Sequence, residues 1–536
     1  MTQTAIDLVS AGLLAGLPAA LLEGRDRDLL APLGWAEPGS LPPAPPAVDR
    51  REIAAALAAT NTAYGHPAAA RLAERLADPR TRVVVTGQQP GLLGGPLFTL
   101  VKARAAVAWA EALEAAGQPA VAVFWMATED HDFTETARLA VPAPGGPRTL
   151  DLGEDPEPLV PLGARSVGAG VEAVLAELEA LSEQPGWREA WGAAARWWRP
   201  AARFGEAFPR LLVAWLGERS PLFLDAQLPQ LKAAERPILA RFVERWREVD
   251  RAYAEATERV ASRGYSPQVS FQSGALPLFL LAGGKRRRLE GREDGTFALR
   301  GAEREPLEPE ELLAAIADNP LLVSPGVLAR PVVQDAVLGT SVFVLGPGEL
   351  SYMAQVAAAY PVVEVAPSLL ALRPSAAVVE PKQLSWLAGL PLPLAQILGD
   401  RGALERRLAE GQGGNLAEGA RARIASELDA LREGALAIDA GLEGPWQKTR
   451  EQVERALTVF GEKLTAAAAR RDELSHRRIE QLREALLPGG RLQERAIAGA
   501  WFVARYGERF VPALERDLGL DPRILHLIRP MTEQGE

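Results

Sequence analysis

The chain has 536 residues, 48 % of them hydrophobic and 24 % charged, which predicts a large core divided among more than one structural unit. Its net charge of −10 argues against a nucleic-acid partner, because phosphate binding is typical of proteins with a basic surplus. With no cysteine, the chain has no disulfide, no thiolate metal site and no cysteine nucleophile.

The sequence also predicts no membrane segment. No window reaches about 18 uninterrupted apolar residues, the length that a transmembrane helix requires. The N-terminal stretch is apolar at Leu13, Leu14 and Leu17, but it lacks a basic n-region and carries Asp7 early, which is unlike a signal peptide. We therefore expect no membrane partner and a cytoplasmic location.

The predicted elements begin with helices and then change to a strand–helix–strand unit. The first eighty residues are helical in texture, and residues 82–86 form a β-branched run that predicts a strand. A glycine-rich loop follows, then a helix pattern over residues 98–116 and a second buried strand over residues 120–126. This order is typical of the βαβ unit of a parallel sheet.

The middle of the chain alternates between helical and strand-like segments. Residues 170–260 are helical in texture, and the short strands predicted around them cover residues 222–225, 277–281, 341–345 and 361–365. We expect these strands to continue the same sheet, so the predicted fold class is α/β, with a parallel-sheet core and helical insertions over residues 1–390. The basic run at residues 285–288 follows two glycines, which indicates a surface β-hairpin turn rather than a nucleic-acid site.

From about residue 390 the pattern changes to heptads. Two apolar seams step by four and three residues, as in coiled coils. They are formed by Ile424, Leu428, Leu431, Ala435, Ile438 and Leu442, and by Val453, Leu457, Phe460, Leu464 and Ala467. Glycine and proline at residues 441–445 predict a turn, so we expect the seams to face each other in an antiparallel hairpin over residues 391–487. Residues 488–536 are predicted to form a helical tail that packs on the core.

The loop between the first predicted strand and its helix is rich in glycine. Glycines there let the backbone approach a ligand, and amide groups at a helix start favour anions. A tight turn without a ligand is the alternative, but the glutamines and the lysine of this segment supply extra hydrogen-bonding groups, and we favour a mononucleotide-sized anionic ligand. The spacing matches neither a Walker loop nor a dinucleotide fingerprint. The candidate binding residues are Thr86, Gly87, Gln88, Gln89, Gly95 and Lys102.

An acidic cluster of Glu129, Asp130, His131 and Asp132 directly follows the second predicted strand. Because ligands of open parallel sheets bind at the carboxyl ends of strands, this cluster suits general-base work or cation binding. A solvated acidic loop with a helix cap explains the same residues equally well. A single histidine without cysteine makes a poor zinc site, so no metal is assigned.

Two further loops follow strand-like segments. Arg330, with Gln334 and Asp335 after it, is suited to clamp a carboxylate or a phosphate in bidentate fashion, although an ordinary surface arginine is the simpler interpretation. Gly348 and Glu349 follow the strand predicted before them, and there the carboxylate serves equally well as a helix cap or as a ligand-binding group.

Taken together, these segments resemble one family along nearly the whole chain. The matching pieces are residues 86–89 with 95–97, 124–125 with 129–133, 330–331 with 334–335, 346–349, and 492–495 after the coiled coil. Each piece is short, but their joint order is similar to that of the BshC family of bacillithiol biosynthesis. The resemblance implies a Rossmann-like core with smaller inserted elements and a C-terminal coiled coil that forms a homodimer.

The resemblance also implies an activity, the joining of cysteine to the glucosamine amine of glucosaminyl-malate. A free carboxylate forms an amide only after activation, and the likeness of the core to nucleotidylyltransferases implies ATP or another adenine nucleotide. The chain departs from adenylate-forming Rossmann enzymes because it lacks a histidine pair after the first strand. Two alternatives stay open: a nucleotide-binding scaffold protein of the pathway without catalysis, and another sugar-directed transferase on the same fold.

The loops that follow neighbouring strands are expected to converge on one pocket. Gln88, residues 130–132 and Glu349 all follow predicted strands, although they lie far apart in the sequence. His131 or Asp132, beside Asp130, would then accept a proton from the attacking sugar amine, which is mostly protonated near neutral pH.

Overall fold

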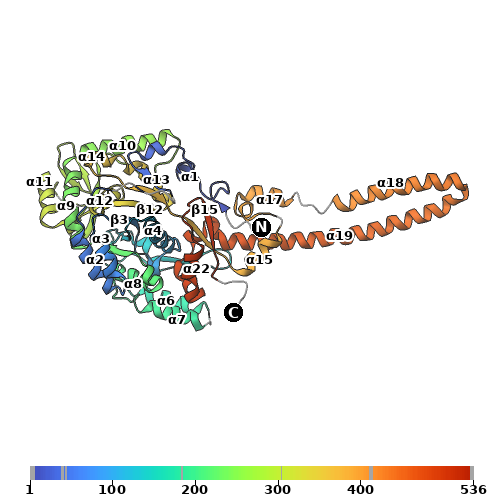
Figure 1. Ribbon diagram of the computed structural model, residues 1–536, viewed down its shortest axis with the longest axis horizontal. Coiled ribbons are helices and arrows are strands. Elements are labelled where there is room, and N and C mark those ends of the chain that lie inside the picture. Colours follow the sequence, from blue (N-terminus) through green and yellow to red (C-terminus); the bar gives the residue numbers. More distant parts are fainter. Residues whose placement is uncertain are drawn as a thin grey trace. The chain divides into compact units, whose positions relative to one another are not determined.

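The computed structural model describes residues 6–37, 42, 45–182, 185–302, 305–390, 392–409 and 415–530 (Figure 1). The chain divides into two compact units. Lys382–Ala485 form the first, called here the helical unit, and the described residues before and after it form the second, called the α/β unit. None of the helices in the described ranges combines the length and the apolar character that crossing a membrane demands.

The α/β unit is built on a six-stranded sheet in which every neighbouring pair is parallel. Its strands, in spatial order, are β2 (Gly34–Trp35), β13 (Leu369–Leu372), β12 (Thr340–Leu345), β3 (Arg82–Gln88), β4 (Ala120–Met126) and β7 (Leu222–Asp225). The chain proceeds outward from β3 to β4 and β7 on one side, and from β12 to β13 on the other. This order confirms the Rossmann-like parallel core and places the switch point of the sheet between β3 and β12.

Alternating side chains of the central strands are buried on both faces of the sheet. Val85 of β3 packs in a cluster with residues of α2 (Arg51–Ala63) and α3 (Ala69–Ala77). Its neighbour Val84 packs on the opposite face with residues of α4 (Phe98–Ala115). Burial on both faces explains why these strands appear in the sequence as continuous apolar runs.

Further helices fill the connections between the strands. They are α1 (Gly16–Leu22), α5 (Phe133–Thr136), α6 (Gly170–Ala180), α7 (Pro185–Ala195), α8 (Phe204–Leu216), α9 (Pro229–Glu244), α10 (Trp246–Ser262), α11 (Pro309–Asp318), α12 (Arg330–Leu338), α13 (Pro347–Val356) and α14 (Ala359–Val363). The last of these corrects a prediction, because residues 361–365 were expected to form a strand. Tyr360 and Val363 are three residues apart and both buried in one apolar cluster, and a helix places such a pair on one face.

The strand predicted at residues 277–281 lies outside the main sheet, contrary to expectation. It belongs to β8 (Ala275–Ala282), which pairs with β9 (Lys285–Gly291) in a four-stranded sheet of order β10–β9–β8–β11. The two outer strands are β10 (Phe297–Leu299) and β11 (Val323–Pro325). A two-residue turn joins β8 to β9, and so short a connection permits only antiparallel pairing, whereas parallel neighbours need a long crossover.

The C-terminal tail is only partly helical. Its helices are α20 (Gln493–Ala496), α21 (Gly499–Tyr506) and α22 (Phe510–Asp517). They are followed by the strand β15 (Ile524–Ile528), which lies between β1 (Ile6–Asp7) and β14 (Ser375–Val378) in a three-stranded sheet. The prediction of a helical tail is wrong for this last segment, because its backbone pairs with strands that are remote in the sequence.

Side chains of α20 tie this tail to the segment after β13. Gln493 Oε1 accepts a hydrogen bond from the amide of Val378 (2.7 Å), and Glu494 Oε2 accepts one from the amide of Ala376 (2.8 Å). Glu494 also forms a buried ion pair with Arg373, with 2.8 Å between Oε1 and Nη2. The tail is therefore held at the edge of the main sheet where the strands end.

The helical unit contains a hairpin of two long helices, α18 (Asn415–Ile438) and α19 (Glu443–Leu486), as Figure 1 shows. Trp446 Nε1 donates to the carbonyl of Leu428 (3.1 Å), and Arg432 forms an ion pair with Glu443 (2.9 Å). These contacts confirm the antiparallel coiled coil. The helices before it in the chain are α15 (Pro381–Gly389), α16 (Leu394–Leu398) and α17 (Arg401–Ala409).

The two heptad seams are only partly closed by this pairing. Leu431, Ile438 and Phe460 remain 61 %, 85 % and 65 % exposed, so the expectation that the seams bury each other is wrong at these positions. A hairpin of two helices covers one side of each helix, and these three side chains lie outside the covered side. The side chains of Leu464 and Ala467 lie outside the described part of the chain.

Candidate active site

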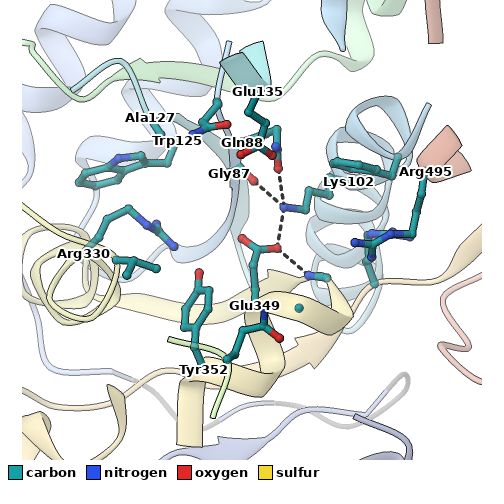
Figure 2. A pocket seen from close by; sticks show the side chains of 17 residues that line it. Gly87, Gln88, Lys102, Trp125, Ala127, Glu135, Arg330, Glu349, Tyr352 and Arg495 are labelled. Carbon is teal, nitrogen blue, oxygen red and sulfur yellow. Dashed lines mark hydrogen bonds and ion pairs between the residues drawn. The ribbon is translucent and has the colours of Figure 1, made fainter. Parts of the chain in front are cut away.

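A cavity of about 400 Å³ opens at the carboxyl edge of the main sheet (Figure 2). It lies at the ends of β3 and β12, where the chain leaves the two strands in opposite directions and a crevice remains between the loops. Its wall includes Gln88, Gln89, Lys102, Glu135, Arg330, Gly348, Glu349, Tyr352, Arg373 and Arg495. The loops after β3 and β12 thus converge as expected, whereas residues 130–132 do not line this cavity.

Lys102 and Glu349 form an ion pair in this wall. The buried Lys102 donates from Nζ to the carbonyl of Gly87 (2.8 Å) and to Oε1 of Gln88 (3.0 Å), and Nζ lies 2.6 Å from Oε2 of Glu349. The same oxygen accepts the amide of Gly346 (2.7 Å), so Glu349 caps α13 and neutralises the lysine at once. Burial lowers the pKa of Lys102 against the opposing effect of Glu349. Its three N–H donors already have three protein acceptors.

Three arginines bring further positive charge to the cavity. Arg330 donates from Nη1 to the side chain of Gln334 (2.9 Å), and Arg373 is neutralised by Glu494. Arg495 is exposed, and within the described ranges its side chain has no hydrogen-bonding or ion-pair partner. The cavity therefore holds two guanidinium groups, on Arg330 and Arg495, that form no ion pair with a described carboxylate. Guanidinium groups bind carboxylates and phosphates well.

Arg373, Arg495 and Glu135 are missing from the site predicted from sequence. Arg373 directly follows β13. Ligands of parallel sheets bind at the carboxyl ends of strands, so a strand predicted at residues 369–372 would have made Arg373 a candidate, as it did for Gln88. Arg495 lies in the segment after the coiled coil that carries the family resemblance, but no local pattern marks it. Glu135 belongs to the short helix α5, where an acidic residue in the first turn is ordinary.

The glycine loop brings side chains, rather than amides, to the cavity. A Cβ at Gly87 would lie 2.7 Å from the carbonyl oxygen of Trp125 on β4, so the close pairing of β3 with β4 requires glycine there. Gly94 and Gly95 have φ of 87° and 72°, a left-handed conformation that glycine adopts readily. The amides of Gly94, Gly95 and Leu97 donate to carbonyls of the chain. These three amides are therefore not free to cradle an anion, contrary to the prediction for this loop.

Three residues of the predicted site have structural contacts. Thr86 is buried, and its hydroxyl donates to a carbonyl of β12 (2.8 Å). Gln334 accepts from Arg330 and so positions that guanidinium at the cavity. Asp335 is buried, where its Oδ2 accepts from the hydroxyl of Tyr360 (2.7 Å) and from the amide before β13 (2.9 Å). Asp335 therefore anchors α14 and β13 and lies outside the cavity wall.

The four residues at 129–132 do not form a single cluster. Glu129 points into the interior, where it pairs with Lys232 (2.6 Å), which also pairs with Glu235 (2.5 Å). Asp132 caps α5, because its Oδ1 accepts from the amide of Glu135 (3.0 Å). These contacts occupy two of the three carboxylates, which removes the basis for cation binding and gives Asp132 the capping role that was the alternative interpretation.

His131 and Asp130 lie beside Arg286, a residue of the basic run that was expected on the surface. Arg286 is buried, and its Nη1 lies 3.3 Å from Nδ1 of His131 and 3.6 Å from Asp130. Successive residues of β9 face opposite sides, so Arg286 points inward although the hairpin itself is confirmed. Asp130 also accepts from the side-chain amide of Gln89, which connects this group to the cavity. Burial and Arg286 lower the pKa of His131.

A second cavity of about 380 Å³ adjoins the first. The residues that line both cavities are Gln88, Gln89, Phe98, Glu135 and Arg495. The remaining wall comes from the glycine loop, from the antiparallel pair β5 (Arg138–Val141) and β6 (Arg148–Asp151), and from residues 491–498. Gly95 lines this second cavity. Two adjoining cavities of this size suit two reactants that must meet.

The buried group of Glu129, Lys232 and Glu235 predicts a pH dependence of stability. Burial raises the pKa of Glu235 to about 8, although Lys232 opposes this effect. Because the folded protein holds this proton more tightly than the unfolded chain, Glu235 stabilises the fold below its ordinary pKa and loses that contribution as pH rises towards 8. The free energy of unfolding is therefore expected to fall between pH 5 and pH 8.5.

The variant Glu235→Gln tests this expectation by urea unfolding at pH 5, 6.5 and 8.5. The neutral amide of the variant does not titrate. The free energy of unfolding of the variant should therefore rise relative to that of the parent as pH rises. Glu244→Gln, an exposed change on the same helix, is the matched control. A difference that stays constant over this range would show that Glu235 does not hold a proton in the fold.

Comparison with known proteins gives two family models that together span most of the chain. The model described as "Bacillithiol biosynthesis BshC, N-terminal Rossmann-like domain" matches residues 43–374. The model described as "Bacillithiol biosynthesis BshC, C-terminal coiled-coil domain" matches residues 376–518. The two matches agree with the order of the parallel sheet and the helical hairpin along the chain.

Similar proteins come from several bacteria. A protein of Salinibacter ruber is 30 % identical over 482 residues, which is 88 % of this chain and 86 % of its own length. A protein of Koribacter versatilis is 30 % identical over 495 residues, 88 % of each chain. A protein of Thermus thermophilus is 33 % identical over 435 residues, which is 79 % of this chain and 84 % of its own length. All three are named "Putative cysteine ligase BshC".

Proposed function

Because this chain belongs to the BshC family of bacillithiol biosynthesis, we propose that it joins cysteine to the glucosamine amine of glucosaminyl-malate. Family membership makes it a cysteine ligase, an enzyme that forms a carbon–nitrogen bond. We propose the identity of the amine substrate and of the activating group.

The charge pattern of the joined cavities is the observation that supports this substrate. Arg330 and Arg495 reach the cavity from different parts of the chain, and neither forms an ion pair with a described carboxylate. Glucosaminyl-malate carries two carboxylates on its malate group, and cysteine carries one. Guanidinium groups bind carboxylates with paired, charge-assisted hydrogen bonds, so this wall suits reactants that bring several of them.

We also propose that ATP or another adenine nucleotide activates the cysteine carboxylate. The nucleotide supplies a phosphate-containing leaving group, without which a free carboxylate does not form an amide. Arg330 and Arg495 would hold its phosphates, because the donors of Lys102 are already bonded within the protein. His131 stays a proposed acid–base residue; its backbone amide donates to Asp130, which accepts in turn from Gln89 of the cavity wall.

The direct test is incubation of the purified full chain with glucosaminyl-malate, cysteine and ATP, followed by mass spectrometry for the thiol product. We expect a product whose mass equals the sum of both substrates less one water, and none when ATP is omitted. Nucleotide binding without product would favour the scaffold alternative. Product from a different sugar amine, with glucosaminyl-malate left unchanged, would favour another sugar-directed transferase.

We further propose that the coiled coil of α18 and α19 joins two copies of the chain. Leu431, Ile438 and Phe460 are large apolar side chains left exposed on one chain, and a second copy would cover them. Changing all three to glutamine is expected to give a folded monomer, measured by light scattering with circular dichroism. Arg421→Gln, an exposed change on α18, should keep the dimer. A dimer that survives the triple change would contradict this assignment.

A further inference from the structure

The place where two reactants meet must border both of the cavities described above. Apart from Gln88, Gln89 and Phe98, the residues common to both walls are Glu135 and Arg495, which carry opposite charges. Figure 2 shows Glu135 and Arg495 among the residues that line the first cavity. With one reactant in each cavity, their reacting ends would lie beside the charged groups at this border.

Unlike the neighbouring carboxylates, the Glu135 side chain has no hydrogen-bond or ion-pair partner among the described residues. Glu349 is paired with Lys102, and Asp130 accepts from Gln89. Asp132 caps the helix to which Glu135 belongs. Among the described residues, no donor and no cation lies within bonding distance of the Glu135 carboxylate. A cavity carboxylate without a bonded protein partner is able to pair with a cationic group of a ligand.

We propose that Glu135 binds the ammonium group of the amine substrate at the border of the two cavities and accepts the proton that must leave before the amine can attack. This inference rests on the proposed function and adds a residue that contacts the reacting atoms. It also divides the roles of the wall: the ammonium group lies against Glu135, and the carboxylates of both substrates lie against Arg330 and Arg495.

The proposed step transfers one proton and forms one carbon–nitrogen bond. The ammonium gives one proton to the Glu135 carboxylate and becomes a neutral amine. Its lone pair attacks the acyl carbon of cysteine, activated as an acyl phosphate or acyl adenylate made from a nucleoside triphosphate. The carbon–nitrogen bond forms, the bond to the phosphate oxygen breaks, and the phosphate group departs with that electron pair. The second proton of the nitrogen passes to solvent, which leaves a neutral amide.

The surroundings of Glu135 favour this proton transfer. Partial loss of hydration in the cavity wall, together with the negative charges of Asp132 and Asp130, raises its pKa, while Lys102 and Arg495 act in the opposite direction. A carboxylate whose pKa is raised accepts a proton more readily from an ammonium group than an ordinary glutamate does. The side chain is exposed to the cavity, so a ligand reaches it without displacing a protein contact.

The test compares Glu135→Gln with the parent as purified full chains. We expect kcat to fall about 100-fold or more, the range for loss of an acid–base residue. The acidic limb of the kcat/KM profile against pH should disappear in this variant. Binding of glucosaminyl-malate, measured by calorimetry without cysteine or nucleotide, should weaken about tenfold or more. The melting temperature should not change, and Glu157→Gln, an exposed change outside both cavities, should match the parent throughout.

Three results would overturn the inference. The first is full turnover by Glu135→Gln. The second is a rise in the KM for cysteine while kcat and the acidic limb stay as in the parent, because the carboxylate would then hold the cysteine ammonium instead. The third is an acidic limb that is lost in His131→Ala but kept in Glu135→Gln, which would assign the proton to the histidine.

Failure of the proposed function has a different signature. A parent that makes no product from glucosaminyl-malate in the complete mixture contradicts the proposed reaction. The inference about Glu135 is then still decided by calorimetry, since it requires that the parent bind glucosaminyl-malate and that Glu135→Gln bind it more weakly. Equal binding by the two proteins overturns it.

Discussion

Lys102→Ala is expected to destabilise the α/β unit by about 3 kcal/mol. It should also weaken nucleotide binding by roughly 1–3 kcal/mol, because the carboxylate of Glu349, left without its lysine, would repel the phosphates. The lysine is buried and neutralises Glu349, whose carboxylate would be left facing the cavity with a single amide partner. The carbonyl of Gly87 and the side chain of Gln88 would also lose their donor. Removing one member of a buried ion pair costs more than the pair contributes, because the other charge stays without compensation.

Urea unfolding and nucleotide calorimetry on the same preparations measure the two effects. The double variant Lys102→Ala with Glu349→Ala should recover part of the lost stability, since it removes the uncompensated charge. Lys285→Ala, a change at an exposed lysine of β9, serves as the control and should change neither quantity. Unchanged stability and unchanged nucleotide affinity in Lys102→Ala would mean that the ion pair does not organise this wall.

Arg495→Ala is expected to lower kcat/KM by about 10- to 100-fold while the free energy of unfolding stays within about 0.5 kcal/mol of the parent. The exposed guanidinium has no protein partner in the described part of the chain, so its removal leaves no buried group unsatisfied. It borders both cavities, so the loss should affect the binding of both anionic reactants. A lower kcat/KM with an unchanged free energy of unfolding is therefore the result that distinguishes a binding residue from a structural one.

Steady-state kinetics with each substrate varied in turn, together with urea unfolding, test this expectation. Arg292→Ala, an exposed change in the turn after β9, should leave both measurements as in the parent. Arg495→Lys should recover only part of the activity, because an ammonium group keeps the charge but lacks the planar pair of donors. Wild-type kcat/KM in Arg495→Ala would remove this residue from the site.

Lys102 and Arg495 differ in how far the sequence could predict them. Lys102 is one of six lysines and lies in the helix that follows the glycine loop, so the sequence placed it correctly near the ends of the strands. The bonding of all three of its N–H donors to Gly87, Gln88 and Glu349 was not predictable, because Glu349 follows a strand almost 250 residues away. Arg495 has no neighbouring pattern of its own, and only the packing of the tail brings it to the cavity.

The acidic cluster at residues 129–132 shows the limit of local reasoning most clearly. Four polar residues after a strand predict a shared site, yet Glu129 and Asp132 have different environments in the fold. The partner of Glu129 is Lys232, which lies on a helix that the local sequence cannot place beneath the loop. The residue with the open carboxylate is Glu135, just beyond the cluster.

The sequence by itself determined the parallel-sheet core, the helical hairpin and the convergence of Gln88 and Glu349. A strand buried on both faces and a heptad repeat can each be recognised from residues that are close in the sequence. The carboxyl ends of parallel strands lie at one edge of a sheet, so the residues after them are expected to meet. Only the tertiary structure decided which charges are neutralised. That depends on pairs such as Arg373 with Glu494, whose members are far apart in the chain, and pairing leaves Arg495 and Glu135 open to a ligand.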